Sequence, residues 1–150
     1  MDEYFMRLAL EEAEKAYHQG EVPVGAVLVL NNEVIARAHN LIELHKQAAS
    51  HAEMLCIKEG AAKLDNWRLL KTTLYCTLEP CSMCAGAMLL SRIDTLVWGA
   101  PDFRHGAHGS WVNLFDQPHP IHHIKIRKGV LAQECGELMR RFFQEKRKEI

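Results

Sequence analysis

Apolar positions in the first forty residues follow a helical repeat and then a strand repeat. Residues 2–19 carry apolar side chains on one helical stripe, with acidic residues at the start and Gly20 directly after the end. Residues 24–30 form a continuous apolar run rich in valine, which is typical of a strand covered on both faces. The Asn-Asn pair that follows tolerates positive φ and leads into residues 34–39, so we expect these two segments to form a β-hairpin.

Helical and strand patterns alternate along the rest of the chain. After a polar loop at 41–50, the pattern predicts a helix at 51–63, a strand at 72–77, a helix at 81–91, a strand at 95–99, a loop at 103–110, a weak strand at 122–127 and a helix at 134–148. Strands separated by helices of about ten or more residues predict a three-layer α/β/α sandwich around a mostly parallel sheet. No repeat, low-complexity tract or linker interrupts the pattern, so we expect a single domain over residues 1–150.

The composition fits one globular domain. The chain has 150 residues, of which 48% are hydrophobic and 25% charged, and a chain of this length can bury a core without disulfides. The longest apolar stretch, residues 22–30, is interrupted by Pro23 and Gly25 and falls far short of the roughly 20 residues that a membrane span needs. The N-terminus is acidic where a signal peptide would be basic. We therefore expect a soluble, cytoplasmic protein.

The net charge of −1 conceals an uneven distribution. Residues 1–70 carry a net charge of −4 and residues 71–120 a net charge of −1, whereas the last thirty residues hold 8 basic against 4 acidic side chains. A basic C-terminal segment of this kind is either an ordinary solvated helix face or a surface for an anionic partner such as nucleic acid.

Five cysteines in a chain without an export signal favour metal or redox chemistry over a disulfide framework. Two of them, Cys81 and Cys84, lie three residues apart at the start of a predicted helix, so their sulfurs share one helix face. Pro80 fits the beginning of a helix, where the helix dipole stabilises thiolates. His51 also stands where a helix is predicted to begin, so one nitrogen and two sulfur ligands could meet at one ion. Soft sulfur together with imidazole favours zinc.

The predicted zinc site has three protein ligands, which leaves the fourth tetrahedral position for water, as in catalytic sites. Zinc lowers the pKa of such a water to about 7, and Glu53, two residues after His51, can carry its proton without being a ligand. A structural zinc site would instead need a fourth protein ligand, for which His45, Cys56, Cys76 and the downstream histidines are candidates. A Cys-x-x-Cys pair alone would also fit thioredoxin-like chemistry or half of a zinc ribbon.

The order His51, Glu53, Pro80, Cys81, Cys84 matches the signature of zinc-dependent nucleobase deaminases. Over nearly its whole length the chain further resembles the bacterial tRNA-specific adenosine deaminases of the cytidine-deaminase-like superfamily. The strings that carry this resemblance include Glu-Val-Pro-Val-Gly-Ala-Val at 21–27, Thr-Leu-Glu-Pro-Cys at 77–81 and Cys-Ala-Gly-Ala at 84–87. The resemblance implies a five-stranded mixed sheet, one Zn²⁺ per subunit, and hydrolytic deamination of adenosine to inosine at the wobble position of a tRNA anticodon.

The resemblance also assigns roles to residues outside the zinc motif. It implies that Asn40 hydrogen-bonds the purine and that Val22 and Val24 pack on the base. It implies that Asp102 contacts the sugar–phosphate of a neighbouring nucleotide. The amide of Asn40 suits an adenine edge, although a turn residue that ends the second predicted strand would fit the same position. The implied mechanism is attack of zinc-bound hydroxide on C6 of adenine, with Glu53 shuttling protons.

Two segments depart from the family pattern. Residues 47–50 read Gln-Ala-Ala-Ser where the family often has Asp-Pro-Thr-Ala, and Pro101 stands where the family commonly has arginine. These departures leave the catalytic residues in place, so we expect them to affect the geometry of the loops around the site and the contacts to the anticodon.

If the substrate is RNA, the basic C-terminal helix becomes a candidate surface for binding it. Arg147 and Lys148 become candidates for phosphate contacts, and Phe142 or Phe143 is free to pack against a nucleotide while the other joins the core. The helix predicted at 81–91 is apolar around more than one face, which favours a partner subunit. The resemblance likewise implies a homodimer that binds the anticodon stem-loop across both subunits.

Two other functions fit the same residues. A small-molecule deaminase of this fold, acting on guanine, cytosine or a free nucleoside, would use the same zinc and the same glutamate. The other is an RNA-binding domain that catalyses no reaction and uses zinc only to stabilise its fold. Such a domain would need neither Glu53 nor an open coordination position on the metal, so both features argue against it. The basic C-terminus and the family strings at 22–26 and 79–87 favour an RNA substrate over a small molecule.

Overall fold

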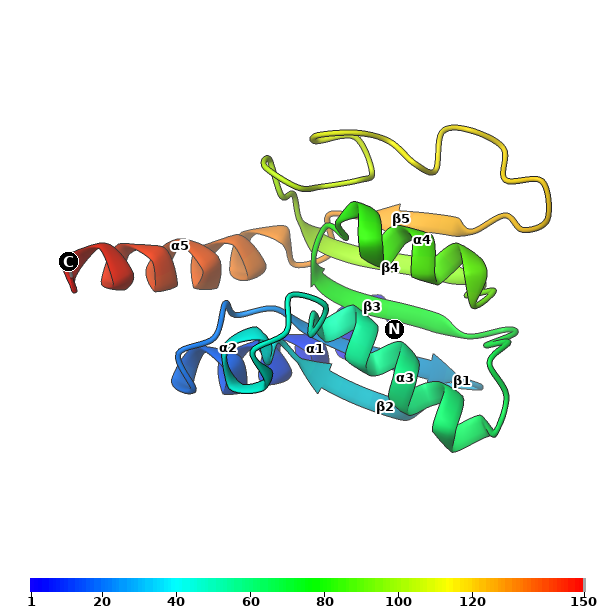
Figure 1. Ribbon diagram of the computed structural model, residues 1–150, viewed down its shortest axis with the longest axis horizontal. Coiled ribbons are helices and arrows are strands. Elements are labelled where there is room, and N and C mark those ends of the chain that lie inside the picture. The colour runs from blue at the N-terminus through cyan, green and yellow to red at the C-terminus, as the bar shows by residue number, and fades with distance from the viewer. Residues whose placement is uncertain (150) are drawn as a thin grey trace.

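The computed structural model describes residues 1–149 and contains a five-stranded sheet between layers of helices (Figure 1). The strands are β1 (Gly25–Leu30), β2 (Glu33–His39), β3 (Thr73–Leu78), β4 (Thr95–Ala100) and β5 (Lys125–Lys128). They lie in the order β2-β1-β3-β4-β5. β1 pairs antiparallel with both β2 and β3, whereas β3, β4 and β5 are parallel. The mixed sheet is confirmed, and the expectation of a mostly parallel sheet is correct only for β3, β4 and β5.

The hairpin between β1 and β2 explains the mixed strand directions. Asn31 (φ 52°) and Asn32 (φ 63°) both adopt the left-handed conformation and reverse the chain, as predicted. Helix α3 (Ala52–Leu64) then carries the chain back past β1, so β3 runs parallel to β2 but pairs antiparallel with β1. The sequence pattern indicates the crossover helix, but it does not indicate which strand the returning chain will pair with.

Helices cover both faces of the sheet. α1 (Asp2–His18) and α5 (Ala132–Lys148) pack on one face, and α3 and α4 (Ser82–Leu90) pack on the other (Figure 1). Along β1, Ala26 and Leu28 belong to the apolar cluster under α3 and α4, whereas Val27 belongs to the cluster under α1. All three are buried, which confirms the prediction of a strand covered on both faces. Each large apolar side chain buried in this way stabilises the fold by about 1.5–3 kcal/mol.

The predicted helices are all present, with ends shifted by one or two residues. The loop predicted at 41–50 contains a single helical turn, α2 (Ile42–His45). The strand predicted at 122–127 is shorter than expected, because Nε2 of His122 donates to the Ile93 carbonyl at 2.6 Å and the chain joins the sheet only at β5. Within residues 1–149 no helix combines the length and the apolar character that crossing a membrane requires.

An ion pair joins the start of α1 to β5, which is an edge strand of the sheet. Asp2 accepts hydrogen bonds from Nε and Nη2 of Arg127 in β5 at 2.6 and 3.0 Å, and from the Tyr75 hydroxyl in β3 at 2.9 Å. The hydrogen bond from Arg127 is the main cause that lowers the pKa of Asp2 below 3.8. A carboxyl whose pKa is lowered by folding stabilises the folded state above its unfolded pKa, and this stabilisation is lost as the pH falls through the folded pKa.

We expect Asp2→Asn to lower the free energy of unfolding by about 1 kcal/mol at pH 7, because the pair is partly exposed and solvent screens it. The difference from the parent protein should shrink as the pH falls below 3.8 and the Asp2 carboxyl becomes protonated. Urea unfolding followed by circular dichroism at pH 7 and in acid measures both values. Glu3→Gln, at the next position, is the matched control. An unchanged free energy of unfolding at pH 7 would contradict a stabilising role for the Asp2–Arg127 ion pair.

Candidate active site

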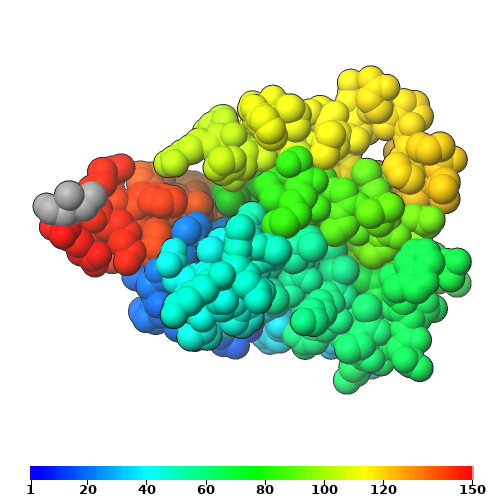
Figure 2. Space-filling model, in the orientation of Figure 1, coloured from blue at the N-terminus to red at the C-terminus, as the bar shows by residue number. Residues whose placement is uncertain are grey.

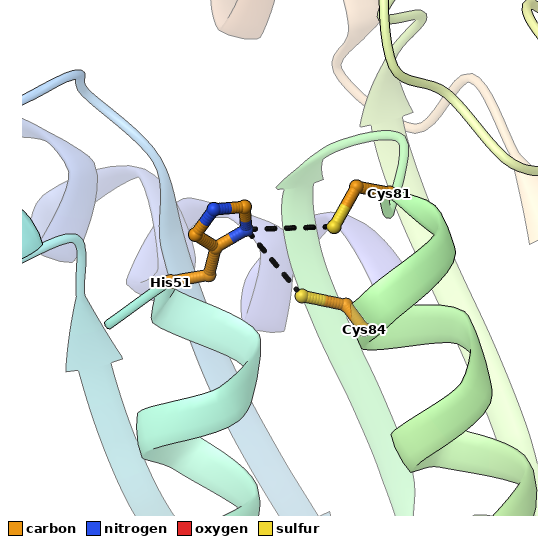
Figure 3. A group of neighbouring side chains, drawn as sticks. All are labelled: His51, Cys81 and Cys84. Carbon is orange, nitrogen blue, oxygen red and sulfur yellow. Dashed lines mark hydrogen bonds between the residues drawn. The ribbon is translucent and has the colours of Figure 1, made fainter. Parts of the chain in front are cut away.

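Two helix N-termini meet on one side of the sheet and bring a histidine and two cysteines together (Figure 3). His51 is the N-cap residue of α3, Cys81 is the N-cap residue of α4, and Cys84 lies in the first turn of α4. Nδ1 of His51 lies 3.5 Å from Sγ of Cys81 and 3.6 Å from Sγ of Cys84. All three ligand atoms lie within 4.8 Å of one another. The structure therefore brings the three ligands predicted from the sequence to one point.

The cluster fits a zinc ion. In tetrahedral zinc sites the Zn–S distance is about 2.3 Å and the Zn–N distance about 2.0–2.1 Å, which separates sulfur and nitrogen ligand atoms by roughly 3.6 Å. Both N–S distances in the cluster match that separation. One imidazole nitrogen and two thiol sulfurs also suit zinc better than magnesium or calcium.

No fourth histidine, cysteine, aspartate or glutamate joins the cluster within residues 1–149. The candidates for a closed structural site have other partners. Nδ1 of His45 hydrogen-bonds Oγ of Ser50 at 2.9 Å, and Cys56 donates to the Ala36 carbonyl at 3.6 Å. Cys76 is buried within β3. The described chain thus supplies three ligands, the number typical of catalytic zinc.

The surroundings of Cys81 favour its thiolate. A hydrogen bond from Cys84 is the largest influence on the pKa of Cys81, a hydrogen bond from His51 adds to it, and the pKa falls to about 4 although partial burial raises it. The same interaction with Cys81 raises the pKa of Cys84, and the hydrogen bond to Cys81 raises the pKa of His51. Cys81 is therefore the first of the two thiols to ionise, and the positive end of the α4 dipole stabilises its charge.

Glu53 is a buried carboxyl that stands close to the cluster along the chain. It lies in the first turn of α3, two residues after His51, and only 3% of it is exposed. Burial raises the pKa of Glu53 to about 7. A carboxyl with this pKa can both hold and release a proton at neutral pH, which suits general acid–base chemistry.

A cleft of about 310 Å³ opens beside the three ligands. In Figure 2, α3 (cyan to green), α4 (green) and the segment before β5 (yellow) lie next to one another on one face of the molecule. The residues predicted from the sequence that line the cleft are Val22, Val24, Asn40, His51, Glu53, Cys81 and Asp102. The other lining residues are Ile42, Leu78, Glu79, Arg104, His105, Met139 and Phe143. Apolar walls with a few polar groups are typical of sites that bind small molecules or single bases.

Two lining residues carry no signal in the sequence. Ile42 comes from α2 and Met139 lies on α5. No local motif marks these positions, because they become neighbours only after the sheet and its covering helices have formed. Conversely, Arg147 and Lys148, which were predicted from charge, lie in the last turn of α5 and outside the cleft lining.

Asn40 links the cleft to the helix that begins at His51. Its Oδ1 accepts a hydrogen bond from the Ala52 amide at 2.7 Å, and its backbone N–H donates to the Val24 carbonyl at 3.1 Å. The residue is buried and lines the cleft. Asn40 is thus more than a turn residue after β2. Since its carbonyl oxygen is already engaged, its side-chain NH₂ is the group available to a bound base.

Asp102 lines another part of the cleft wall. Its Oδ1 accepts hydrogen bonds from the amides of Arg104 and His105 at 3.1 and 3.2 Å. The guanidinium carbon of Arg104 lies 5.8 Å from the centroid of the Phe143 ring. This wall therefore presents a carboxylate, a guanidinium and an aromatic ring next to one another.

Comparisons with known proteins identify the family of the chain. The family model of the cytidine and deoxycytidylate deaminase zinc-binding region matches residues 1–100. A tRNA-specific adenosine deaminase of Bacillus subtilis is 50% identical over 98% of this chain and 91% of its own length. The chain belongs to the tRNA-specific adenosine deaminase family.

Other similar proteins agree with membership of the tRNA-specific adenosine deaminase family. The chloroplastic tRNA(adenine(34)) deaminase of Arabidopsis thaliana is 52% identical over 96% of this chain, although the chain spans only 12% of that protein's length. A solved structure from a study of A-to-I editing by tRNA:A34 deaminases has a TM-score of 0.86 and 42% identity, and the match covers 90% of this chain and 98% of that one. A guanine deaminase from Nitrosomonas europaea has a TM-score of 0.77 at 24% identity over 93% of this chain and 83% of its own, and shares the fold alone.

Membership of the tRNA-specific adenosine deaminase family confirms the resemblance, the cytidine-deaminase-like fold and zinc as the cofactor. The protein is a hydrolase of C–N bonds. The departure from the family pattern at residues 47–50 is accommodated locally. The Ser50 amide donates to the Gln47 carbonyl at 3.1 Å, and the Leu41 amide donates to the Ser50 carbonyl at 3.1 Å. This segment closes on itself directly before His51.

Proposed function

We propose that the protein deaminates adenosine to inosine at the wobble position of a tRNA anticodon and releases ammonia. Relatives that are 50% and 52% identical are named as deaminases of adenosine or adenine in tRNA. The observation that carries the proposal is the cluster of His51, Cys81 and Cys84, of which His51 and Cys81 line the same cleft as the buried carboxyl of Glu53. An anticodon loop presents unpaired bases that enter such a cleft at small unstacking cost, whereas a base inside a duplex is out of reach.

The proposed chemistry is hydrolysis at C6 of adenine. Zinc held by His51, Cys81 and Cys84 would supply a water activated for attack at neutral pH. Glu53 takes one proton from the attacking water and passes it to N1 of the ring. It then takes the remaining proton from the oxygen added to C6 and delivers it to the amino group, which leaves as ammonia when the C6–N bond breaks. Because Glu53 is buried, little of its carboxyl contacts bulk solvent.

The walls of the cleft are proposed to hold the base and its neighbour. Val22 and Val24 offer apolar surface on the side of the cleft that also carries Asn40. The side-chain NH₂ of Asn40 donates to an acceptor on the purine edge. Asp102, which also lines the cleft, contacts the sugar–phosphate of an adjacent nucleotide.

An assay with three substrates tests the proposed function. The zinc-loaded protein is incubated with an anticodon stem-loop that carries a wobble adenosine, with free guanine and with cytidine. We expect inosine and ammonia from the stem-loop, and no ammonia from guanine or cytidine. Ammonia from guanine without inosine in the RNA would replace the proposal with a small-molecule deaminase.

The basic end of α5 continues one wall of the cleft. Met139 and Phe143 line the cleft, and Arg147 lies one turn further along the same helix face. Lys146 is directed elsewhere, since its Nζ lies 5.5 Å from the centroid of the Phe142 ring. Phe142 is buried and Phe143 is only partly buried, so we propose Phe143 as the ring that packs against a nucleotide.

We expect Arg147→Glu to weaken binding of the anticodon stem-loop more than Lys148→Glu does, because Arg147 shares a helix face with the cleft-lining residues. The loss of affinity should be largest at low salt. The magnitude of the slope of the logarithm of the association constant against the logarithm of the salt concentration should decrease by about 1 for one lost phosphate contact. Fluorescence anisotropy at several ionic strengths measures both. Lys63→Glu, which makes the same charge change at the other end of α3 from His51, is the control. Equal affinities for Arg147→Glu and Lys63→Glu at low salt would remove α5 from the RNA surface.

The proposed assembly is a homodimer that binds the anticodon stem-loop across both subunits. α4 buries Met88 against the sheet yet exposes 37% of Met83 and 65% of Leu90. Trp111 and Leu114 are exposed as well. Large apolar side chains exposed on one element favour a surface for a partner chain. Sedimentation that shows only monomer at the assay concentration would contradict the dimer.

Two predictions from the sequence accompany this function. We expect residues 1–150 to act as one zinc-dependent deaminase domain. We also expect a cytoplasmic location, because a tRNA-modifying enzyme must meet its substrate. Fractionation of cells that express the tagged protein, followed by immunoblotting, tests the second prediction.

A further inference from the structure

A second buried carboxyl, that of Glu79, lines the cleft but takes no part in the zinc cluster. The residue follows β3 and directly precedes Pro80, and only 1% of it is exposed. Its backbone N–H donates to the Ala100 carbonyl at 2.8 Å, which fixes Glu79 against β4. Burying a carboxylate is costly unless hydrogen bonds replace its hydration, so the donors around Glu79 indicate what the residue does.

Within residues 1–149 the hydrogen-bond donors to the Glu79 side chain all belong to one loop. Oε1 accepts from the Asp102 amide at 3.1 Å and from the Ser110 hydroxyl. Oε2 accepts from the amides of His108 and Ser110 at 2.8 and 3.2 Å. These four hydrogen bonds replace the hydration that the carboxylate loses on burial. Both oxygens are thus committed to holding the loop 101–110.

The same loop is attached to the segment that carries a zinc ligand. The Ala107 amide donates to the Pro80 carbonyl at 2.8 Å, and Gly106 pairs with Cys81 in an isolated β-bridge. A Cβ at Gly106 would overlap the carboxyl group of Glu79, so the loop backbone passes directly against this side chain. The loop therefore cannot move away from the zinc site without breaking several of the hydrogen bonds that it donates to Glu79.

Between these attachments the loop carries one wall of the cleft, formed by Asp102, Arg104 and His105. We infer that Glu79 is a positioning residue that holds this wall at a fixed distance from the zinc ligands. Glu79 thereby controls the affinity for the RNA substrate and has little influence on the chemical step. This inference rests on the proposed function, because the substrate whose affinity changes is the anticodon stem-loop.

Glu79→Gln is the direct test. Glutamine keeps the volume of the side chain but replaces one acceptor oxygen by an NH₂ group that faces N–H donors. Loss of hydrogen bonds to a charged acceptor is expected to raise KM for the stem-loop about tenfold or more, whereas kcat changes less than about threefold. Zinc content should stay at one per chain. The amides of Asp102 and His108 should also exchange with deuterium faster than in the parent protein.

A matched control separates positioning from general stability. Glu12 is another buried carboxyl, 4% exposed, which accepts hydrogen bonds from Lys15, Arg37 and His39 away from the cleft. We expect Glu12→Gln to lower the melting temperature while KM and the exchange of the loop amides stay as in the parent protein. Ser110→Ala, which removes a single donor hydroxyl, should raise KM about threefold and provides the test if Glu79→Gln does not fold.

Two results would overturn the inference. One is an unchanged KM in the variant that folds, together with unchanged protection of the loop amides. The other is loss of zinc with a collapse of kcat, since Glu79 would then serve the metal site and not the wall. If the parent protein forms no inosine, the proposed function fails instead, and the exchange rates of the loop amides still decide whether Glu79 holds the loop.

Discussion

Glu53→Gln is expected to reduce deamination of the anticodon stem-loop by about 10²–10⁴-fold or more while zinc stays bound. The substitution keeps the size of a side chain that is almost fully buried in the first turn of α3, so the helix and its N-cap residue His51 should remain in place. What is lost is the group that can take, hold and return a proton. Single-turnover measurement of inosine formation, with metal analysis of the same sample, measures both effects.

Glu59→Gln is the matched control for this prediction. Glu59 lies on the same helix but is exposed to solvent. The control should deaminate the stem-loop at the parental rate. Near-parental activity of Glu53→Gln with one zinc per chain would show that another group moves the protons.

Cys84→Ala is expected to abolish zinc binding and all activity. Its sulfur is one of three ligand atoms in the cluster, and even the loss of an outer-shell partner lowers metal affinity about 10–100-fold, so the loss of a ligand should lower it further. Zinc that binds only the folded chain stabilises it by mass action, by about 4 kcal/mol at a thousandfold excess over Kd. The variant should lose this gain, so its melting temperature should not respond to added zinc or to a chelator.

Cys56→Ala is the matched control for the loss of a thiol. Cys56 is also buried, on α3, and its thiol donates to the Ala36 carbonyl instead of facing the cluster. We expect this variant to lose some stability, to keep one zinc per chain, and to melt at a higher temperature when zinc is added. Retention of one zinc per chain in Cys84→Ala would refute a site built on three ligands.

The zinc cluster could be predicted because each ligand stands in a short local pattern. His51 and Cys81 both occupy predicted helix starts, and the structure makes each the N-cap residue of its helix. Glu53 and Cys84 follow within the first turn of the same helices. Local periodicity likewise sufficed for the helices and for the β1–β2 hairpin, because these features depend on neighbours in sequence.

Features that depend on distant pairing could not be predicted from the sequence. The direction of β3 relative to β1 is set by which strand edge the returning chain meets. The engagement of the Asn40 carbonyl by the Ala52 amide requires β2 and α3 to be in place. The donors to Glu79 stand 23 to 31 residues further along the chain, so nothing near Glu79 in the sequence indicates its partners.

The way the loop 101–110 is attached has a consequence for how such an enzyme can diversify. Asp102 and the stretch from Gly106 to Ser110 are tied to Glu79, Pro80 and Cys81. The three positions between them, 103–105, form a short bridge whose side chains include the 80% exposed Phe103. Because none of these side chains belongs to the metal cluster, we expect substitutions at 103–105 to change the preference among RNA substrates and to leave zinc binding intact.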